Sequence, residues 1–263
     1  MFFLKIAKDT VCIARSASPL SRRLQLLKGL LSSALGRGRL FGWKINHLSK
    51  PALILLYSEI FARECYRFTS KKNDPVILDC GANIGMATLY FKWLYPAAQI
   101  TAFEPDPATF KALQNNISSN RLPGVVAHNI ALGGQDTEIS FHVPEAGSLM
   151  MSAVPSRVQG ETLQVPCRRL STFITGEVDL LKLDIEGMEG PVVDELADSG
   201  KLSLVREFVI EIHHNLPNSP TSLTGVLRKL EQAGFHYQII NVHAASSDIN
   251  SFQDVLVHAI KIS

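Results

Sequence analysis

From about residue 73 onward, short apolar segments alternate with segments of helical periodicity, and this alternation leaves few folds open to the chain. The predicted strands are 76–79, 99–103, 125–130, 178–184, 207–212, 237–240 and 255–260. The predicted helices between them are 85–95, 107–119, 189–199 and 222–233. Strands that alternate with helices are typical of βαβ units, so we expect an α/β fold with a mostly parallel sheet.

Three further segments fall outside this alternation. Two β-like stretches, 138–143 and 163–170, follow the third strand. The stretch between them, 144–155, has turn residues at both ends and an apolar middle, which predicts a loop or lid. Before residue 70, the apolar positions of 52–66 recur at helical spacing, and this segment is expected to pack on the domain that follows.

The composition suits one folded domain with a short appendage. Of the 263 residues, 46% are hydrophobic and 19% are charged, and no low-complexity tract occurs, which excludes a disordered chain. The longest apolar stretch, 51–57, is far shorter than the roughly 20 residues of a membrane-spanning helix. We therefore expect a helical, basic extension at 1–70, followed by one α/β domain at 71–263.

Positive charge is concentrated at the amino terminus. Residues 1–50 hold ten lysines and arginines against one acid, Asp9, although the net charge of the chain is only +2. A solvated basic face is the simpler interpretation, and contact with an anionic membrane or glycan is the alternative. Charges within the first nine residues do not fit a cleaved secretory signal, and the four cysteines form no C-x-x-C pair, so the expected location is the cytoplasm.

The segment Val76-Ile-Leu-Asp-Cys-Gly-Ala-Asn-Ile-Gly85 runs from a predicted strand into a predicted helix. Gly81 allows the chain to turn sharply beside a ligand, and Gly85 allows close packing of the helix on the strand. A dinucleotide fingerprint has three glycines here, but this chain has Asn83 in place of one and an acid, Asp79, at the end of the strand. An acid disfavours a pyrophosphate and suits a ligand with ammonium and sulfonium groups, such as S-adenosylmethionine. The alternative is a structural βα turn.

A second acid, Glu104, stands at the tip of the next predicted strand, 25 residues after Asp79. A carboxylate at that position can accept hydrogen bonds from both hydroxyls of a ribose. Pro105 and Pro107 follow, and proline is well tolerated at the start of a helix because an N–H there has no helical partner. At the end of the third strand, Asn129 is a candidate for a hydrogen bond to an adenine, with an ordinary strand-end role as the alternative.

Acids and histidines gather at the carboxyl ends of two later strands, 178–184 and 207–212. They are Asp184, Glu186, Glu211, His213 and His214. Because the carboxyl ends of parallel strands meet at the ligand-binding edge of an open α/β sheet, these side chains are expected to face one cleft. Glu189 begins the following helix, where a solvated position is the simpler interpretation.

Two chemistries are open to this group. A histidine or a carboxylate can take the proton from a hydroxyl as its oxygen attacks a methyl group. Alternatively, Asp184, Glu211 and His213 can bind a divalent cation that acidifies the hydroxyl. No ligand spacing of a known metal site is present, so no metal ligand is predicted. A structural, hydrogen-bonded role is a further alternative for His213.

With these motifs the sequence resembles the FkbM family of S-adenosylmethionine-dependent methyltransferases over residues 50–240. The segments that carry the resemblance are 79–85, 102–107, 131–134 and 179–189. The resemblance implies a class I methyltransferase fold, in which a Rossmann-like seven-stranded sheet has the order 3-2-1-4-5-7-6, an antiparallel last strand and helices on both faces. It also implies transfer of a methyl group, by in-line displacement, to a hydroxyl of a sugar, a glycolipid or a natural product.

The resemblance also implies roles for single residues. Those expected along the methionine end of the cofactor are Asp79, Gly81, Ala82, Asn83 and Gly85. Glu104 is expected to hold the ribose, and Asp184 and Glu186 are expected to border the reaction centre. Ser148 and Ser152 lie in the predicted lid, where the family also has serines.

Other functions fit the motifs less well. Asn83 and Asp79 argue against a nicotinamide dehydrogenase, and a nucleic-acid amino-methyltransferase would have a D/N-P-P-Y/F signature where this chain has Asp184-Ile-Glu-Gly187. A non-catalytic scaffold that binds an anionic glycan or lipid through the basic extension is a further alternative. The expected partners are S-adenosylmethionine and a small-molecule, sugar or lipid-linked acceptor, with no nucleic acid.

Overall fold

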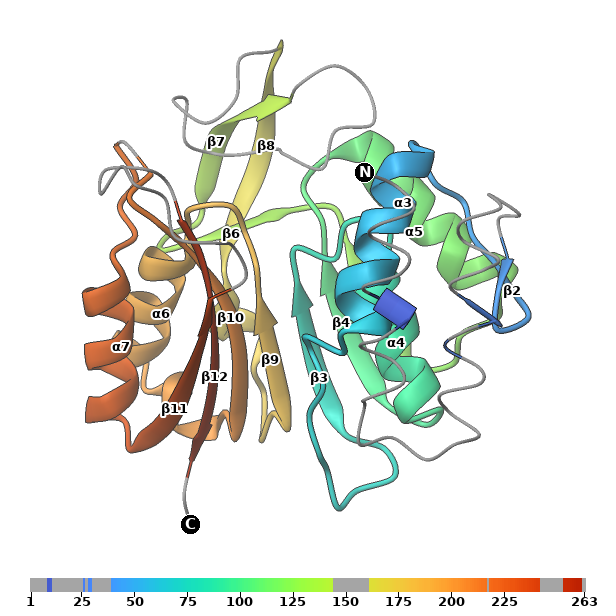
Figure 1. Ribbon diagram of the computed structural model, residues 1–263. Coiled ribbons are helices and arrows are strands. Elements are labelled where there is room, and N and C mark those ends of the chain that lie inside the picture. Colours follow the sequence, from blue (N-terminus) through green and yellow to red (C-terminus); the bar gives the residue numbers. More distant parts are fainter. Residues whose placement is uncertain are drawn as a thin grey trace.

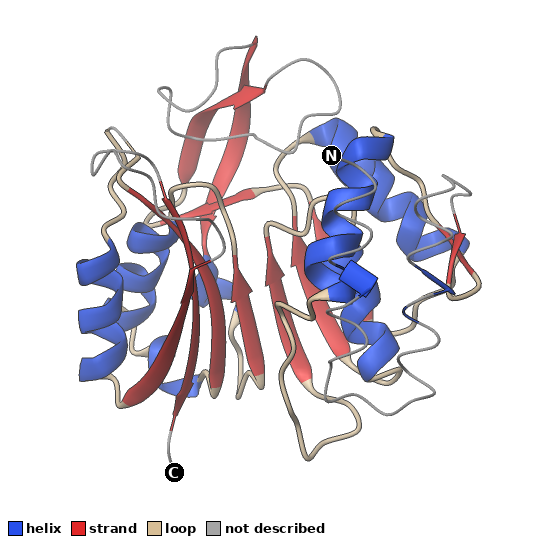
Figure 2. Ribbon diagram, in the orientation of Figure 1, coloured by secondary structure: helices blue, strands red, loops and turns tan. Residues whose placement is uncertain are grey.

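The computed structural model describes residues 9–10, 26, 28–29, 39–143, 161–216, 218–241 and 253–261 (Figure 1). A seven-stranded sheet lies at its centre, with helices on both faces (Figure 2). In spatial order the strands are β5 (Val125–His128), β4 (Gln99–Phe103), β3 (Val76–Cys80), β9 (Leu180–Leu183), β10 (Glu207–His214), β12 (Gln253–Lys261) and β11 (Phe235–Asn241).

The order and direction of these strands are those that the resemblance implied. Strands β5, β4, β3, β9 and β10 run parallel, and β12 is antiparallel to both of its neighbours. Numbered along the chain within this sheet, the spatial order is 3-2-1-4-5-7-6, which confirms the predicted topology. The carboxyl ends of the parallel strands therefore meet at one edge of the sheet.

Four helices accompany the sheet, and each has bounds within one residue of the predicted ones. They are α4 (Met86–Leu94), α5 (Pro107–Ser119), α6 (Glu189–Asp198) and α7 (Leu223–Gln232). Helix α5 begins where Asp106 accepts a hydrogen bond from the N–H of Thr109, with Pro107 at the first position. Ser222 caps α7 in the same way through the N–H of Gly225. Both caps satisfy backbone donors that have no partner inside the helix.

The two faces of the sheet carry separate hydrophobic cores, because successive residues of a strand point to opposite sides. Ile77 and Leu180 pack on one side with residues of α4. Leu78 and Leu181 pack on the other side with residues of α6 and α7. Strands that are buried on both sides form continuous apolar runs, and this explains why β3 and β9 were recognisable in the sequence.

A second, three-stranded sheet adjoins the first beyond the end of β5 (Figure 1). Its strands, in the spatial order β6-β8-β7, are β6 (Ala131–Gly133), β8 (Glu161–Arg169) and β7 (Thr137–Val143). The two β-like stretches after the third strand are therefore strands, as predicted. The third strand of the main sheet ends at His128 rather than at residue 130, because the chain leaves this sheet to enter β6. The predicted lid, with Ser148 and Ser152, lies outside the described residues.

The described part of the amino-terminal extension shares the core of the domain. Its elements are β1 (Arg39–Leu40), β2 (Trp43–Lys44), α3 (Lys50–Leu56) and the π-helical turn η1 (Tyr57–Ala62). Tyr57 and Phe61 stack on one another, and Phe61 contacts Tyr90 and Trp93 of α4. Most residues before 39 lie outside the described part, so the helical extension and the boundary at residue 70 stay predictions. No helix among the described residues is long and apolar enough to cross a membrane.

Candidate active site

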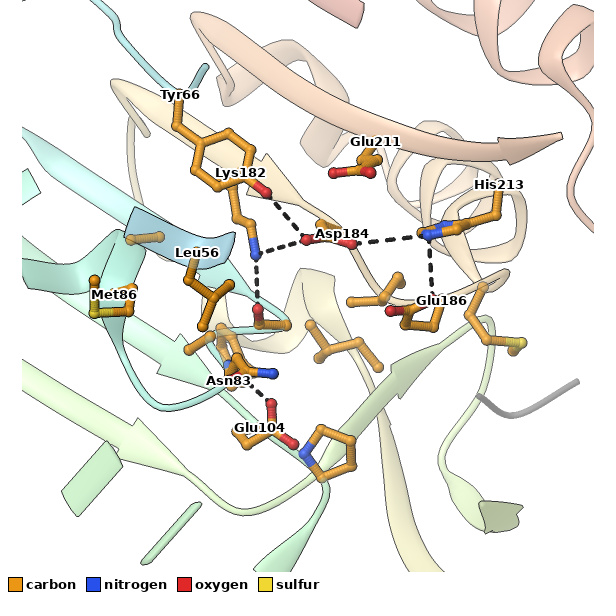
Figure 3. A pocket seen from close by; sticks show the side chains of 18 of the residues that line it. Leu56, Tyr66, Asn83, Met86, Glu104, Lys182, Asp184, Glu186, Glu211 and His213 are labelled. Carbon is orange, nitrogen blue, oxygen red and sulfur yellow. Dashed lines mark hydrogen bonds and ion pairs between the residues drawn. The ribbon is translucent and has the colours of Figure 1, made fainter. Parts of the chain in front are cut away.

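A cavity of about 550 Å³ opens at the carboxyl ends of β3, β4, β9 and β10 (Figure 3). Open α/β sheets bind their ligands at this edge. The predicted site residues that line it are Gly81, Ala82, Asn83, Glu104, Asp184, Glu186, Glu211 and His213. Three other predicted residues, Asp79, Gly85 and Asn129, do not line it.

The turn between β3 and α4 passes against the end of β9. Gly81 has a φ of +79°, and a Cβ atom there would lie 1.8 Å from the carbonyl oxygen of Asp184. No other residue tolerates both this conformation and this approach. Asn83 also has a left-handed backbone, with a φ of +51°, and its N–H donates to Oε2 of Glu104 at 2.9 Å. The turn thereby connects the acid after β4 with the acid after β9.

Glu104 is a buried acid that faces the cavity from the end of β4 (Figure 3). Its two oxygens accept hydrogen bonds from the N–H groups of Asn83, at 2.9 Å, and Asp106, at 3.0 Å. Burial raises the pKa of Glu104 to about 8, and these two hydrogen bonds only partly oppose that shift. Because each carboxylate oxygen has two acceptor sites, both can also accept a hydrogen bond from a ligand. This position suits a pair of hydroxyl donors.

Asp79 lies beneath the turn, fully buried and away from the cavity. Its carboxylate accepts a hydrogen bond of 2.6 Å from the hydroxyl of Thr88 in α4, and one oxygen lies 3.6 Å from Nζ of Lys182. The expectation that Asp79 meets the ammonium group of a ligand is therefore corrected, because a lysine of the protein occupies that role. Strand alternation is the physical reason, since it turns this side chain toward α4.

Gly85 and Asn129 do not line the cavity and contact other parts of the protein, so their contact with a ligand stays a prediction. Gly85 precedes α4 with a φ of +90°, and a Cβ atom there would lie 2.7 Å from a methyl carbon of Leu113. Asn129 donates from Nδ2 to the carbonyl oxygens of Glu104 and Pro105, at 2.8 Å each. These bonds commit the amide nitrogen of Asn129 to the loop after β4 rather than to an adenine.

Lys182, in the middle of β9, is a buried cation that the sequence-based site did not include. Its Nζ donates to the carbonyl oxygens of Cys80, at 3.2 Å, and Gly81, at 2.7 Å, and lies 3.4 Å from Asp184. Burial lowers the pKa of a lysine, but Asp184 and Asp79 outweigh this and raise the pKa of Lys182 above its ordinary value. The charged lysine thereby joins the glycine turn to the acid at the end of β9.

Tyr66, from the segment after η1, reaches the same acid. Its hydroxyl donates to Oδ2 of Asp184 at 3.1 Å, and its ring lies 5.3 Å from Nζ of Lys182, as in a cation–π contact. Burial opposes ionisation of Asp184, but Lys182 and His213 hold the pKa of this carboxyl below its usual value. Asp184 is therefore an ionised carboxylate, oriented from two sides (Figure 3).

The buried imidazole of His213 lies near acids from three different parts of the fold. Nδ1 lies 2.8 Å from Glu189, while Nε2 lies 3.2 Å from Glu186, 3.6 Å from Asp254 and 4.0 Å from Asp184. Burial alone would lower the pKa of His213, but Glu189 and the neighbouring acids outweigh it and raise that pKa to about 10. At neutral pH His213 is therefore an imidazolium, which donates hydrogen bonds and has no free site for a proton.

Glu189 is the acid that orients this imidazolium. It is fully buried, and the same oxygen that contacts His213 also accepts hydrogen bonds from the N–H groups of Ile185, at 3.2 Å, and Gly187, at 3.0 Å. The interpretation of Glu189 as a solvated residue at the start of a helix was therefore wrong. Periodicity placed this residue on α6, but only the fold of the loop before α6 brings it under His213.

Glu211 and Asp254 complete the polar end of the cavity. Glu211, on β10, has a pKa raised well above its usual value, first by burial and then by the charge of Asp184. Potential metal-ligand atoms lie within 4.8 Å of one another in two groups: Asp184, Glu186 and His213, and Glu211, His213 and Asp254. His214, which was predicted at the same edge, does not line the cavity.

Glu59, Tyr66, Lys182 and Asp254 are the polar residues of the cavity lining that sequence reasoning missed. For Lys182 a signal existed, because a lysine inside a buried apolar run requires acidic partners nearby. For Tyr66 no signal existed, because its partner Asp184 is 118 residues away in the sequence. Asp254 likewise lies on the antiparallel strand β12, far from the motifs of the parallel strands.

Comparisons with known proteins relate this chain to methyltransferases. A family model described as the methyltransferase FkbM domain matches residues 79–237. Methyltransferase 1 of Beauveria bassiana is 32% identical over 231 residues, which cover 79% of this chain and 90% of that protein. The 31-O-demethyl-FK506 methyltransferase FkbM of Streptomyces tacrolimicus is 27% identical over 208 residues, which cover 65% of this chain and 79% of that protein.

The comparison with solved structures includes one that most of this chain aligns with. It is the methyltransferase FkbM of Methylobacillus flagellatus, with a TM-score of 0.50 and 16% sequence identity. The alignment covers 90% of this chain but only 60% of that longer one.

Proposed function

Because the chain belongs to the family of FkbM methyltransferase domains, we propose that it moves a methyl group from S-adenosylmethionine to a hydroxyl oxygen of a sugar, a lipid-linked molecule or a natural product. The observation that carries the proposal is one cavity with two ends. A buried acid suited to a ribose lies at one end, and a group of acids around an imidazolium lies at the other. The name of the Streptomyces relative, a 31-O-demethyl-FK506 methyltransferase, supports oxygen as the acceptor atom.

The residues at the first end fit the cofactor. Glu104 offers buried acceptor sites to ribose hydroxyls, and the backbone of Gly81, Ala82 and Asn83 leaves a space where side chains would otherwise project. Asp184 presents an ionised carboxylate to the cationic methionine end. When bound, S-adenosylmethionine would supply a methyl carbon that a nucleophile attacks from the side opposite the sulfur, with S-adenosylhomocysteine as the leaving group.

The chain's own contribution is mostly positional. Holding two reacting atoms in line removes much of the entropic barrier, whereas a well-placed base adds roughly 10²–10⁴-fold. We assign the proton from the acceptor hydroxyl to Asp184, since this acid is ionised and is held by Tyr66 and Lys182. His213 does not take that proton, because it is already protonated, and it donates hydrogen bonds instead.

A metal-assisted version of the reaction is the second candidate. One observation favours it: Glu189 fixes Nδ1 of His213, which leaves Nε2 facing Glu186, Asp254 and Asp184. A carboxylate behind a histidine orients metal-binding imidazoles in the same way. Loss of methyl transfer in EDTA, with recovery on addition of Mg²⁺ or Mn²⁺, would support this candidate, and full activity in EDTA would contradict it.

Isothermal titration tests the cofactor end directly. The purified protein is titrated with S-adenosylmethionine, S-adenosylhomocysteine and NAD⁺, and we expect micromolar binding of the first two only. Glu104→Ala should weaken both by at least about tenfold, because the two ribose hydroxyls lose their hydrogen bonds to Glu104, each worth roughly 0.5–1.5 kcal/mol. Glu138→Ala, at an exposed position on β7, is the matched control and should change nothing. Tight binding of NAD⁺ in place of the sulfur cofactors would overturn the proposal.

A further inference from the structure

Each of the two bases that line the cavity lies close to a carboxylate that is outside the cavity. Lys182 lies 3.6 Å from Asp79, and Nδ1 of His213 lies 2.8 Å from Glu189, while neither acid lines the cavity. Lys182 and His213 are the only bases among the described residues that line it. The charge that a ligand meets at this end is therefore set by five acids: Glu59, Asp184, Glu186, Glu211 and Asp254.

Asp184, Glu186 and Asp254 are held by groups of the protein. The hydroxyl of Tyr66 donates to Asp184 at 3.1 Å. The imidazolium of His213 lies 3.2 Å from Glu186 and 3.6 Å from Asp254. Their orientations are therefore fixed before any ligand arrives.

Glu211 differs from these three acids. It makes no hydrogen bond or ion pair with any described residue, yet it is half-buried, lines the cavity and lies beside Asp184 in Figure 3. A carboxyl group that lines a cavity without a partner in the protein offers acceptor sites to a hydrogen-bond donor or a positive group of a ligand.

We propose that Glu211 receives a hydroxyl or ammonium group of the acceptor, next to the oxygen that is methylated. The site thereby selects neutral or cationic acceptors with hydrogen-bond donors and rejects acceptors with a carboxylate or phosphate at that position. The inference rests on the proposed function, and it adds the charge class of the acceptor. An anionic acceptor would meet these five acids, and the two bases that line the cavity are already paired with Asp79 and Glu189, which lie outside it.

Binding of two cofactor analogues tests this charge selectivity without a known acceptor. S-adenosylhomocysteine is uncharged at the transfer point, whereas sinefungin carries an ammonium group there. We expect isothermal titration to give sinefungin at least about tenfold higher affinity than S-adenosylhomocysteine, as for a cation beside half-buried acids. Glu211→Gln should reduce this ratio at least about threefold and leave the affinity for S-adenosylhomocysteine unchanged. Glu138→Gln is the matched control and should keep the wild-type ratio.

Two results would overturn the inference while the proposed function stands. In the first, S-adenosylhomocysteine binds but the sinefungin ratio is near one, or Glu211→Gln leaves the ratio unchanged. In the second, labelled methyl groups pass to a methyl glucuronide as fast as to the matched methyl glucoside. Failure of the folded protein to bind S-adenosylhomocysteine at all is a different result, since it would reject the proposed function itself.

Discussion

At the scale of single residues, the cavity depends on a few buried charges that hold one another. Lys182 and His213 each lie between an acid outside the cavity and an acid that lines it. Removing one member of such a buried pair leaves the other without compensation, which typically costs about 3–5 kcal/mol. These groups therefore contribute to the stability of the fold as well as to the shape of the site.

The substitution Tyr66→Phe tests whether methyl transfer depends on the hydrogen bond that orients Asp184. Tyr66→Phe keeps the ring against Lys182 but removes the hydrogen bond to Asp184, so we expect methyl transfer to slow about tenfold, for a lost bond of roughly 1.4 kcal/mol. Cofactor affinity measured by titration should stay within about twofold, since the ring remains in place. Tyr237→Phe, which removes an exposed hydrogen bond to Glu231, is the control. A purely structural role would instead lower stability with no change in turnover.

The pH dependence of stability reports the charge of His213. Its pKa is about 10 in the folded protein against an ordinary value of 6.5, so the folded state binds the proton more tightly. The resulting stabilisation is complete below pH 6.5 and is lost as the pH rises toward 10, by an amount on the order of a few kcal/mol. Urea unfolding at pH 6 to 10 should show this decline, and His213→Gln should flatten it. An unchanged slope in that variant would contradict the assignment, and the exposed His236→Gln is the control.

At the scale of elements, the site is made where the β3–α4 turn crosses the end of β9. Its geometry depends on the positive φ of Gly81 and on the absence of a Cβ atom against the carbonyl of Asp184. The motif containing this glycine was recognised from the sequence, as were the strands on each side of it. The contact between the turn and the end of β9 was not recognised from the sequence, because it joins residues that are about a hundred positions apart.

Gly81→Ala tests that crossing. An added Cβ atom 1.8 Å from the Asp184 carbonyl oxygen forces the turn away from β9, and the positive φ adds strain. We expect loss of cofactor binding and a fall of at least about 2 kcal/mol in the free energy of unfolding. Gly176→Ala, where nothing lies within 4 Å of the added atom, should change neither. Normal cofactor affinity in Gly81→Ala would show that the turn does not touch the cofactor.

At the scale of the whole molecule, the amino-terminal segment and the sheet form one hydrophobic core. Leu53, Tyr57, Phe61 and Phe68 are buried in the same cluster as Ile77 and Tyr90. The same segment contributes Tyr66 to the cavity. A boundary near residue 70 marks a change of sequence pattern, but the packing continues across it.

Removal of residues 1–70 tests the independence of the domain. The fragment 71–263 would expose the face of α4 that Phe61 and Tyr57 cover, and it would lack Tyr66. Because an exposed apolar patch of this kind is not compensated by other contacts, we expect aggregation or an unfolding midpoint at least about 10 °C lower. A fragment that unfolds cooperatively at the temperature of the full chain would support the boundary at residue 70 as it was predicted.

Local patterns in the sequence determined the strands, the helices, the glycine turn and the acids at the strand ends, because each depends on neighbouring residues and on strand periodicity. The order of the strands in the sheet was implied by the family resemblance, since periodicity does not contain it. Tertiary structure alone decided which acids meet a ligand. It turned Asp79 toward Lys182, placed Glu189 beneath His213, and brought Tyr66 and Asp254 to the cavity. The pairing of buried charges depends on distances in space, and a one-dimensional pattern does not contain these distances. The protonation of His213 was undecided for the same reason, since its pKa is set by acids from three separate elements.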